Sequence, residues 1–140
     1  MTKTLLILLL FFGNQVFAQD IFGSWKTIDD QTGKARSIVH IYKEDSKVFG
    51  RIDKILNPEK QDALCVECEG EDKDKPIQGM VIIRGLEKDG DQYNSGKILD
   101  PESGNLYKCY IELEDADKLK VRGYIGLAVI GRTQYWYRVE

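Results

Sequence analysis

The sequence predicts an all-β protein, a small antiparallel up-and-down barrel of about eight strands with one long, disulfide-closed loop. Short apolar runs rich in Ile, Val, Tyr, Phe and Trp recur along the chain, separated by Gly, Asp, Asn and Pro. Most connections between these runs have the length and composition of hairpin turns. Tryptophan motifs stand at both ends of this region, in Gly23-Ser24-Trp25 and in residues 131–138, where the first and last strands of a barrel would pair.

The N-terminus predicts a secretion signal, which lies outside the fold. Lys3 precedes an apolar run over residues 5–12, and Val16-Phe17-Ala18 suits signal peptidase. A membrane-spanning helix needs about 20 apolar residues, so an uncleaved anchor is the less favoured alternative. We therefore expect residues 1–18 to be a signal peptide, residues 19–140 to form one domain, and the protein to be periplasmic or extracellular.

The mature chain has the size of one ordinary domain and a slightly acidic balance. Without Lys3 it carries 19 basic and 23 acidic side chains, and the basic ones are spread along the chain. Nucleic acid is therefore not an expected partner. The acidic residues at positions 67–74 alternate with Lys73 and Lys75 at the end of the stretch, which favours a solvated loop over a cation site.

Eight segments have the composition of strands and follow one another in the mature chain. They are residues 21–29, 37–43, 47–55, 79–86, 93–99, 106–113, 118–125 and 132–139. Alternation is clearest in the seventh, where Leu119 and Val121 alternate with Lys118, Lys120 and Arg122 and mark a core-facing side.

The connection over residues 100–105 illustrates the turn chemistry. Pro101 suits the second position of a type I turn, Asp100 can accept a hydrogen bond from the turn backbone, and Gly104 tolerates positive φ. This structural role explains Asp100 without assigning it to catalysis.

One connection, residues 57–78, is long for so compact a domain and contains Cys65-Val66-Glu67-Cys68. In an exported chain this pair predicts a Cys65–Cys68 disulfide that rigidifies the loop. A bridge from Cys109 to either cysteine, thiol exchange, and zinc held by both cysteines with Cys109 and His40 are the alternatives. Alternation along its strand favours a buried free thiol for Cys109.

Catalytic motifs are not found. His40 is the single histidine, and on a strand it would project away from Val39 and Ile41. The sequence contains neither a Gly-x-Ser-x-Gly nucleophile elbow nor a glycine-rich phosphate loop. We therefore assign no catalytic residues and expect neither a cofactor nor a metal.

Two families share motifs with this chain. Gly23-Ser24-Trp25 on a first strand, with an arginine on a late strand able to stack over the indole, resembles the lipocalins and related calycin barrels. A longer pattern resembles the uncharacterised secreted bacterial family catalogued as domain of unknown function 2147 (DUF2147). Its segments are residues 23–25, 37–39, 50–52, 65–70, 76–79, 96–101, 119–124 and 131–138. This resemblance implies a small exported barrel of unestablished activity, supplies no catalytic residues, and implies that a second disulfide of some relatives is absent at residues 123–124.

We interpret Trp25, Trp136 and Arg138 as the residues that close the barrel, through aromatic burial and cation–π stacking. A ligand would then enter at the opposite end, and the leading hypothesis is a non-catalytic carrier of a small apolar or amphipathic ligand. Its candidate cavity residues are Lys97, Arg122, Arg132 and Gln134. The alternative is an interior filled by side chains such as Phe49, Ile83, Tyr107, Ile111 and Val121.

A second hypothesis is a monomer that contacts an envelope protein or a membrane surface through residues 124–130, with Leu127 and Ile130 as the contacts. The favoured alternative for this apolar segment is a loop tucked into the barrel mouth. A remote third hypothesis is a hydrolase-like enzyme that gathers polar side chains from several strands. Those side chains are Lys97, Asp100, Arg122, Arg132 and Gln134.

Overall fold

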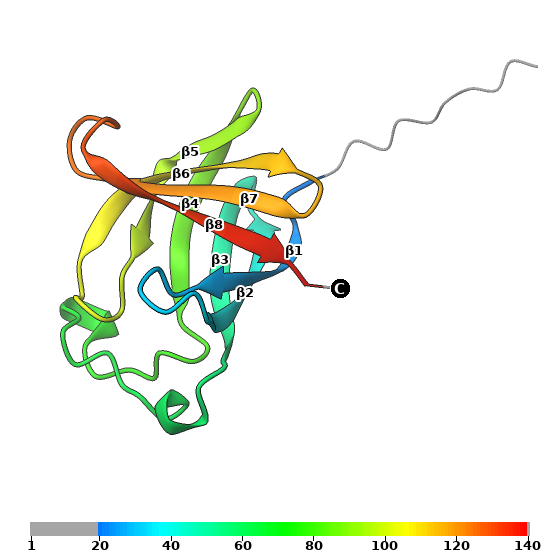
Figure 1. The fold of residues 1–140 in the computed structure, drawn as a ribbon. Helices are drawn as coiled ribbons and strands as arrows, with labels where there is room; N and C mark the ends of the chain where they lie inside the picture. Colours follow the sequence, from blue (N-terminus) through cyan, green and yellow to red (C-terminus); the bar gives the residue numbers. More distant parts are fainter. Residues whose placement is uncertain (1–19, 140) are drawn as a thin grey trace, which may run out of the picture.

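A computed structural model describes residues 20–139 and shows eight antiparallel strands closed into one barrel (Figure 1). The strands are β1 (Gly23–Ile28), β2 (Ala35–Glu44), β3 (Lys47–Ile55), β4 (Val81–Asp89), β5 (Gln92–Leu99), β6 (Leu106–Asp115), β7 (Lys118–Tyr124) and β8 (Gly131–Arg138). The predicted all-β fold and up-and-down order are confirmed. The predicted signal peptide lies outside the described residues.

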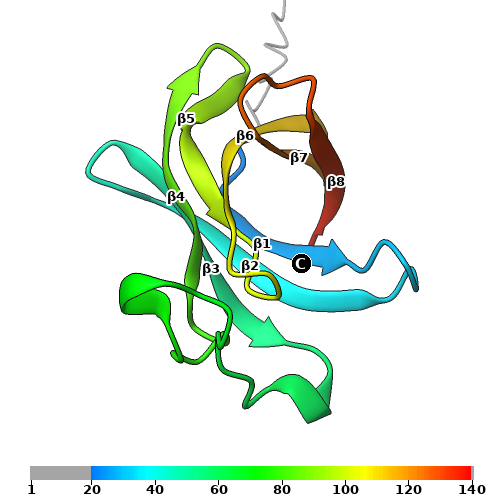
Figure 2. The same ribbon diagram turned by 90° about the vertical axis from the view of Figure 1, so that its left-hand side faces the viewer.

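Each strand pairs with the next, and β1 pairs with β8 to close the ring (Figure 2). The closing seam is short: Trp25 lies opposite Arg138 and Lys26 opposite Tyr137. By comparison, β7 and β8 pair from Lys118–Tyr137 to Tyr124–Gly131. The two ends of the mature chain therefore meet, as an up-and-down barrel requires.

The core is formed by alternate side chains of all eight strands. Ile41, Ile83, Ile111 and Leu119 are fully buried with Trp25, so the predicted inward face of β7 is confirmed. Cys109 is also fully buried and carries a free thiol, as predicted. Burial raises the pKa of the Cys109 thiol to about 12, so the group remains a neutral, small apolar side chain.

The connection between β3 and β4 contains two short 3₁₀ helices, Pro58–Lys60 and Gly70–Asp72. Between them the predicted Cys65–Cys68 disulfide is formed and buried, so neither cysteine is available as a zinc ligand. Gly104 has a φ of +75°, and a Cβ at this position would overlap the Glu67 carbonyl group. Gly104 thus permits both the predicted turn and a close approach of the long loop to the β5–β6 turn. Within the described part of the chain, no helix is long and apolar enough to cross a membrane.

Candidate functional site: a cavity at one end of the barrel

The two ends of the barrel are built differently. Tight turns join β2 to β3, β4 to β5 and β6 to β7 at one end, which we call the closed end. The connections β1–β2, β3–β4, β5–β6 and β7–β8 lie at the other end, which we call the mouth (Figures 1 and 2).

The closed end is sealed by Trp25 and Arg138. The Trp25 indole is fully buried and donates a hydrogen bond from Nε1 to the Ile21 carbonyl at 2.8 Å. The Arg138 guanidinium carbon lies 4.4 Å from the centre of the Trp25 ring. Arg138 also donates to the carbonyls of Ala116 at 2.9 Å, Phe22 at 3.1 Å and Asp20 at 2.7 Å. One side chain thus ties the segment before β1 and the β6–β7 turn to the last strand.

Above this plug, a cavity of about 1110 Å³ extends to the mouth. Its deep wall is mainly aliphatic and aromatic, and comprises Ile52, Ile55, Ile82, Ile98, Leu99, Tyr107, Val121 and Trp136. Small side chains at Thr27, Ala35, Ser37 and Gly123 leave the space open. The volume is slightly above the range of about 300–1,000 Å³ that is usual for small-molecule sites in proteins.

The alternative of a completely filled interior is wrong for the half of the barrel nearest the mouth. Ile83 and Ile111 fill the core as predicted, whereas Tyr107 and Val121 line the cavity without filling it. Phe49 faces outward and stacks on Tyr42, with ring centres 5.9 Å apart. The inward positions of β3 belong instead to its neighbours Val48 and Gly50, which are buried.

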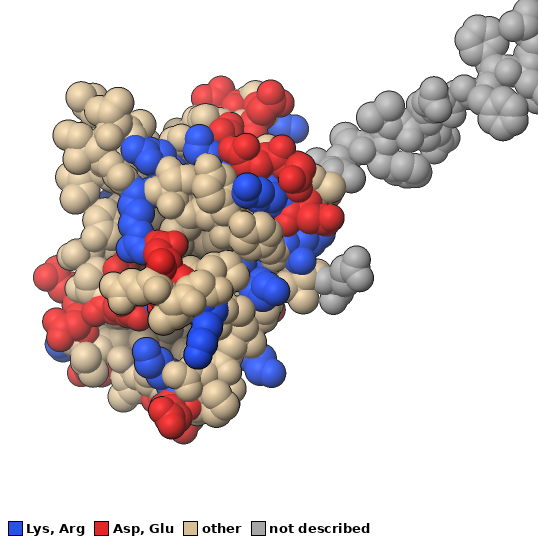
Figure 3. All heavy atoms as spheres, viewed as in Figure 1, with Lys and Arg blue, Asp and Glu red and all other residues tan. Residues whose placement is uncertain are grey.

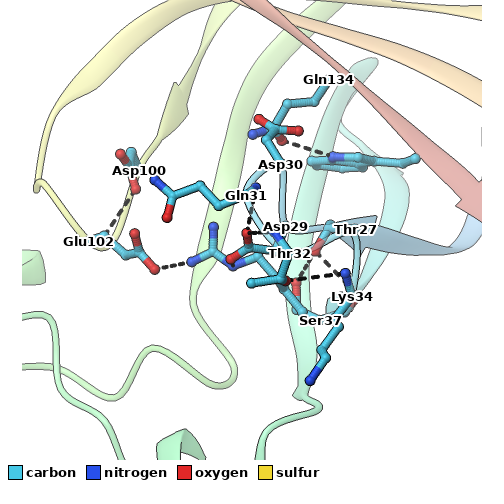
Figure 4. A network of polar contacts seen from close by, with 12 residues as sticks. Thr27, Asp29, Asp30, Gln31, Thr32, Lys34, Ser37, Asp100, Glu102 and Gln134 are labelled. Carbon is cyan, nitrogen blue, oxygen red and sulfur yellow. Dashed lines mark hydrogen bonds and ion pairs between the residues drawn. The ribbon is translucent and has the colours of Figure 1, made fainter.

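A few polar side chains interrupt the apolar wall. The hydroxyl groups of Thr27 and Ser37 lie 2.7 Å apart, and both residues line the cavity. Gln134 accepts a hydrogen bond from Trp136 Nε1 through Oε1 at 3.3 Å. Its amide nitrogen has no hydrogen-bond partner within residues 20–139, so it can donate to a ligand (Figure 4).

Ion pairs surround the mouth and connect its loops. Arg36 pairs with Glu102 of the β5–β6 turn and lies 3.8 Å from the Asp29 carboxylate. Arg132 of β8 pairs with Asp30. The β1–β2 loop is thereby joined to two other parts of the rim. Figure 4 shows the side of this network that contains Asp29, Glu102 and Asp100.

Asp29 organises the β1–β2 loop. Its Oδ1 accepts hydrogen bonds from the backbone N–H groups of Gln31 at 2.8 Å and Thr32 at 3.0 Å. The bonds from Thr32 and Gln31, with the nearby charge of Arg36, hold the pKa of Asp29 below its ordinary value. These bonds stabilise the ionised carboxylate because they strengthen with its charge.

We expect this loop to keep its ordered turn when the pH falls past the ordinary pKa of an aspartate. The pKa of Asp29 is lower in the folded state than in the unfolded chain. The stabilisation by the ionised carboxylate is therefore complete above the unfolded-state pKa, and it is lost as the pH falls through the folded-state pKa. In an NMR titration, the amide chemical shifts of Gln31 and Thr32 should change with one common pH midpoint, which lies below the ordinary pKa of an aspartate. The Asp29→Asn variant should show no such transition. A midpoint at or above the ordinary value would contradict this assignment.

The four predicted cavity residues divide into two groups. Arg132 and Gln134 line the cavity. Lys97 and Arg122 do not, which corrects the prediction: Lys97 is exposed, and Arg122 donates to the Ala128 carbonyl at 2.8 Å and to Thr133 Oγ1 at 2.7 Å outside the barrel. Both stand on the outward positions of their strands.

The polar cluster of the hydrolase hypothesis is therefore not assembled, because two of its five members lie outside the cavity. Asp100 lines the rim, where it accepts hydrogen bonds from Glu102 N and Ser103 Oγ at 3.0 Å each, and this is the predicted turn role. His40 projects outward beside Tyr42, away from the buried Val39. Within residues 20–139, no three His, Cys, Asp or Glu side chains are grouped as metal ligands.

Sequence reasoning missed several cavity residues, above all Thr27, Ser37 and Arg36. For Arg132 and Gln134, which were predicted, the signal was the alternation of β8, since they stand four and two positions before Trp136 and share its inward face. Thr27 and Ser37 carried no comparable signal, because isolated hydroxyl residues are common on both faces of strands.

The apolar segment between β7 and β8 is exposed, and its expected burial in the mouth is wrong. Ile125 and Ile130 border the cavity entrance, yet they remain 66% and 64% exposed. Leu127 and Val129 do not line the cavity and are 70% and 81% exposed. Of the two predicted contacts, Ile130 thus lies at the rim and Leu127 projects from it.

Comparisons with known proteins agree with this architecture. A family model described as an uncharacterised protein conserved in bacteria, DUF2147, matches residues 23–138. The fold is similar to that of protein HP1028 from Helicobacter pylori, described as belonging to the lipocalin family, with a TM-score of 0.77 and 17% sequence identity. That match covers 88% of this chain and 85% of the other. No curated protein sequence matches the chain.

Proposed function

Since the chain belongs to the DUF2147 family and folds as a lipocalin-like barrel, we propose that it is a non-catalytic carrier that holds a small amphipathic ligand inside the barrel. The observation that carries this proposal is the cavity of about 1110 Å³, closed at one end and lined mainly by apolar side chains. Such a space with a few polar groups is typical of small-molecule sites.

The lining indicates how a ligand would be oriented. Its apolar part would contact Ile52, Ile82, Ile98 and Val121 in the deep wall. Burial of apolar surface there supplies the affinity. A polar group could bond to the Gln134 amide within the cavity.

At the rim, a ligand with an acidic group would meet basic side chains. Lys34 and Lys60 border the cavity and form no ion pair within the described residues. The rim's other cations, Arg36 and Arg132, are already paired with carboxylates. An apolar molecule with one carboxylate or hydroxyl end therefore fits both the wall and the rim.

Two features support action outside the cytoplasm. The N-terminal run over residues 5–12 has the pattern of a secretion signal, and the Cys65–Cys68 disulfide is typical of oxidising compartments. We propose that the mature protein is periplasmic or extracellular.

Blocking the cavity tests the proposal. Gly123 lines the cavity, and a side chain there would extend beside Ile98 and Tyr107. We expect Gly123→Phe to weaken binding of a fluorescent fatty-acid probe at least tenfold, about 1.4 kcal/mol. Lys26→Phe places the same ring on the exposed outer face of β1 and should leave binding unchanged.

Titration of probe fluorescence measures the Kd of each variant, and circular dichroism confirms that each is folded. Equal Kd values for Gly123→Phe and the parent protein would place the probe outside the cavity and contradict the proposal. Native mass spectrometry of protein purified from its own host should show a mass greater than that of the chain alone. Organic solvent should release the bound molecule chemically unchanged, as expected for a non-catalytic carrier.

A further inference from the structure

The connection between β7 and β8, residues 125–130, forms an apolar projection that we call the tip. It presents Ile125, Leu127, Val129 and Ile130, each more than 60% exposed. Figure 3 shows it as the uncharged projection at upper left. Contiguous exposed aliphatic side chains mark an interaction site, because water contact with them is unfavourable.

The tip is held in this exposed conformation. Ile125 N donates to the Ile130 carbonyl at 3.1 Å, and Ile130 N donates to the Leu127 carbonyl at 3.0 Å. Arg122 fixes the other side of the turn through the Ala128 carbonyl at 2.8 Å. Gly126 has a φ of +69°, which favours glycine. The aliphatic side chains therefore project from a defined turn.

Basic residues without ion-pair partners stand beside the tip. Arg84, Lys97, Lys108 and Tyr124 form one row across β4, β5, β6 and β7 on the outer face, in which Arg84 is paired with Asp72. Lys97 and Lys108 are directly opposite each other and exposed, and neither forms an ion pair within residues 20–139. Like charges in such a pair destabilise the sheet, so their placement calls for an anionic partner.

Acidic side chains are unevenly distributed over the molecule and are most frequent at the closed end, although lysines such as Lys43 and Lys88 lie among them there. Acidic side chains gather on the three closed-end turns, at residues 44–45, 89–91 and 114–117. Figure 3 shows basic side chains next to the tip and a group of acidic ones away from it, at upper right. A further acidic stretch, residues 67–74, belongs to the β3–β4 connection on another side of the mouth. An anionic surface would thus attract the side that carries the tip and repel the closed end.

We propose that the tip inserts into the surface of a lipid bilayer that contains anionic headgroups. Leu127 and Val129 would enter the boundary between headgroups and acyl chains, and Lys97 and Lys108 would lie over the headgroups. Protein interfaces favour Tyr, Trp and Arg and are depleted in Lys. The tip has only aliphatic side chains and glycine, and the two cations of the adjacent row that form no ion pair within the described residues are lysines, although Tyr124 and Arg122 also adjoin the tip. The composition therefore selects a lipid surface over a protein partner.

This docking goes beyond carrier function and has a geometric consequence. Ile125 and Ile130 belong both to the tip and to the cavity lining. A bilayer that receives the tip therefore lies next to the cavity entrance, where an amphipathic molecule could pass between the two without crossing bulk water.

Vesicle binding tests the inference on protein without residues 1–18, because the closed barrel lies within residues 20–139. The protein should sediment with vesicles made from equal parts of phosphatidylcholine and phosphatidylglycerol, and bind pure phosphatidylcholine more weakly. Leu127→Ser/Val129→Ser should lower the partition coefficient at least tenfold. Lys97→Gln/Lys108→Gln should lower it roughly tenfold on the anionic vesicles alone.

Matched controls carry equal chemical changes elsewhere. Leu64→Ser/Val66→Ser removes two exposed aliphatic side chains from the long loop, and Lys43→Gln/Lys88→Gln removes two exposed lysines from the closed end. Neither should change vesicle binding. Gly123→Phe should also bind vesicles normally, which separates a failure of this inference from a failure of the carrier proposal.

Three results would overturn the inference: absence of vesicle binding by the parent protein, equal binding by the tip variant, or equal loss in the controls. Sedimentation velocity supplies a further test without lipid. If the parent protein dimerises and Leu127→Ser/Val129→Ser is monomeric, the tip binds a second copy of the chain and not a bilayer.

Discussion

Replacing Trp25 with alanine should lower the free energy of unfolding by about 3–5 kcal/mol, the usual cost of truncating a large buried aromatic residue. The indole is fully buried, donates to the Ile21 carbonyl and supports the Arg138 guanidinium. The substitution would remove all three interactions at the seam between β1 and β8. Urea unfolding followed by circular dichroism measures the change.

Two companion variants separate these contributions. Trp25→Phe retains most of the apolar contact but removes the Nε1 donor, so it should cost less than alanine. Tyr137→Ala removes an aromatic ring that is 41% exposed on the same seam and should cost about 1 kcal/mol or less. If Trp25→Ala and Tyr137→Ala lost equal stability, the plug would not be the main stabilising feature of the seam.

Arg138→Met should lower the free energy of unfolding by about 2–4 kcal/mol, since hydrogen bonds from a charged donor contribute about 1.5–3 kcal/mol each and do not add fully. Methionine keeps the aliphatic stem but loses the three bonds to Ala116, Phe22 and Asp20. The contact with Asp117 adds little, because at 3.9 Å the carboxylate is 82% exposed. Chemical denaturation again measures the effect.

The geometry of the guanidinium distinguishes this role from a general charge effect. Arg138→Lys keeps the charge but cannot direct its donors to three separate carbonyls, so it should recover less than half of the lost stability. Arg51→Met removes the partly exposed pair with Asp53 and should cost below about 1 kcal/mol. Full recovery by lysine would show that charge alone matters at this position.

These predictions divide the barrel into two halves with different roles. Packing at the closed end, where Trp25 and Arg138 meet, supplies stability. The half nearest the mouth keeps small residues such as Ser37 and Gly123 at inward positions and therefore stays hollow. The unfilled cavity lowers the stability of the fold, and the close packing at the closed end offsets this loss.

Much of the fold could be predicted from the chain because its signals are local. Alternation in β7, turn residues between strands and the spacing of Cys65 from Cys68 each depend on a few neighbouring residues. The boundaries were less accurate: β2 begins at Ala35, two residues earlier than predicted, beside a register shift after Thr27. Such shifts depend on the partner strand and leave no clear mark in sequence.

The sequence by itself thus determined the class of fold, the strand order and the disulfide, because turns and alternation act over a few residues. Only the tertiary structure decided which side chains share the cavity. In β5 a register shift between Tyr93 and Gly96 resets the alternation, and Lys97 consequently faces outward opposite Lys108. Likewise, composition marked residues 125–130 as apolar, but their exposure depends on long-range contacts such as that of Arg122 with Ala128. The face of a strand and the direction of a loop are set by partners distant in the chain, which is why those features required the fold.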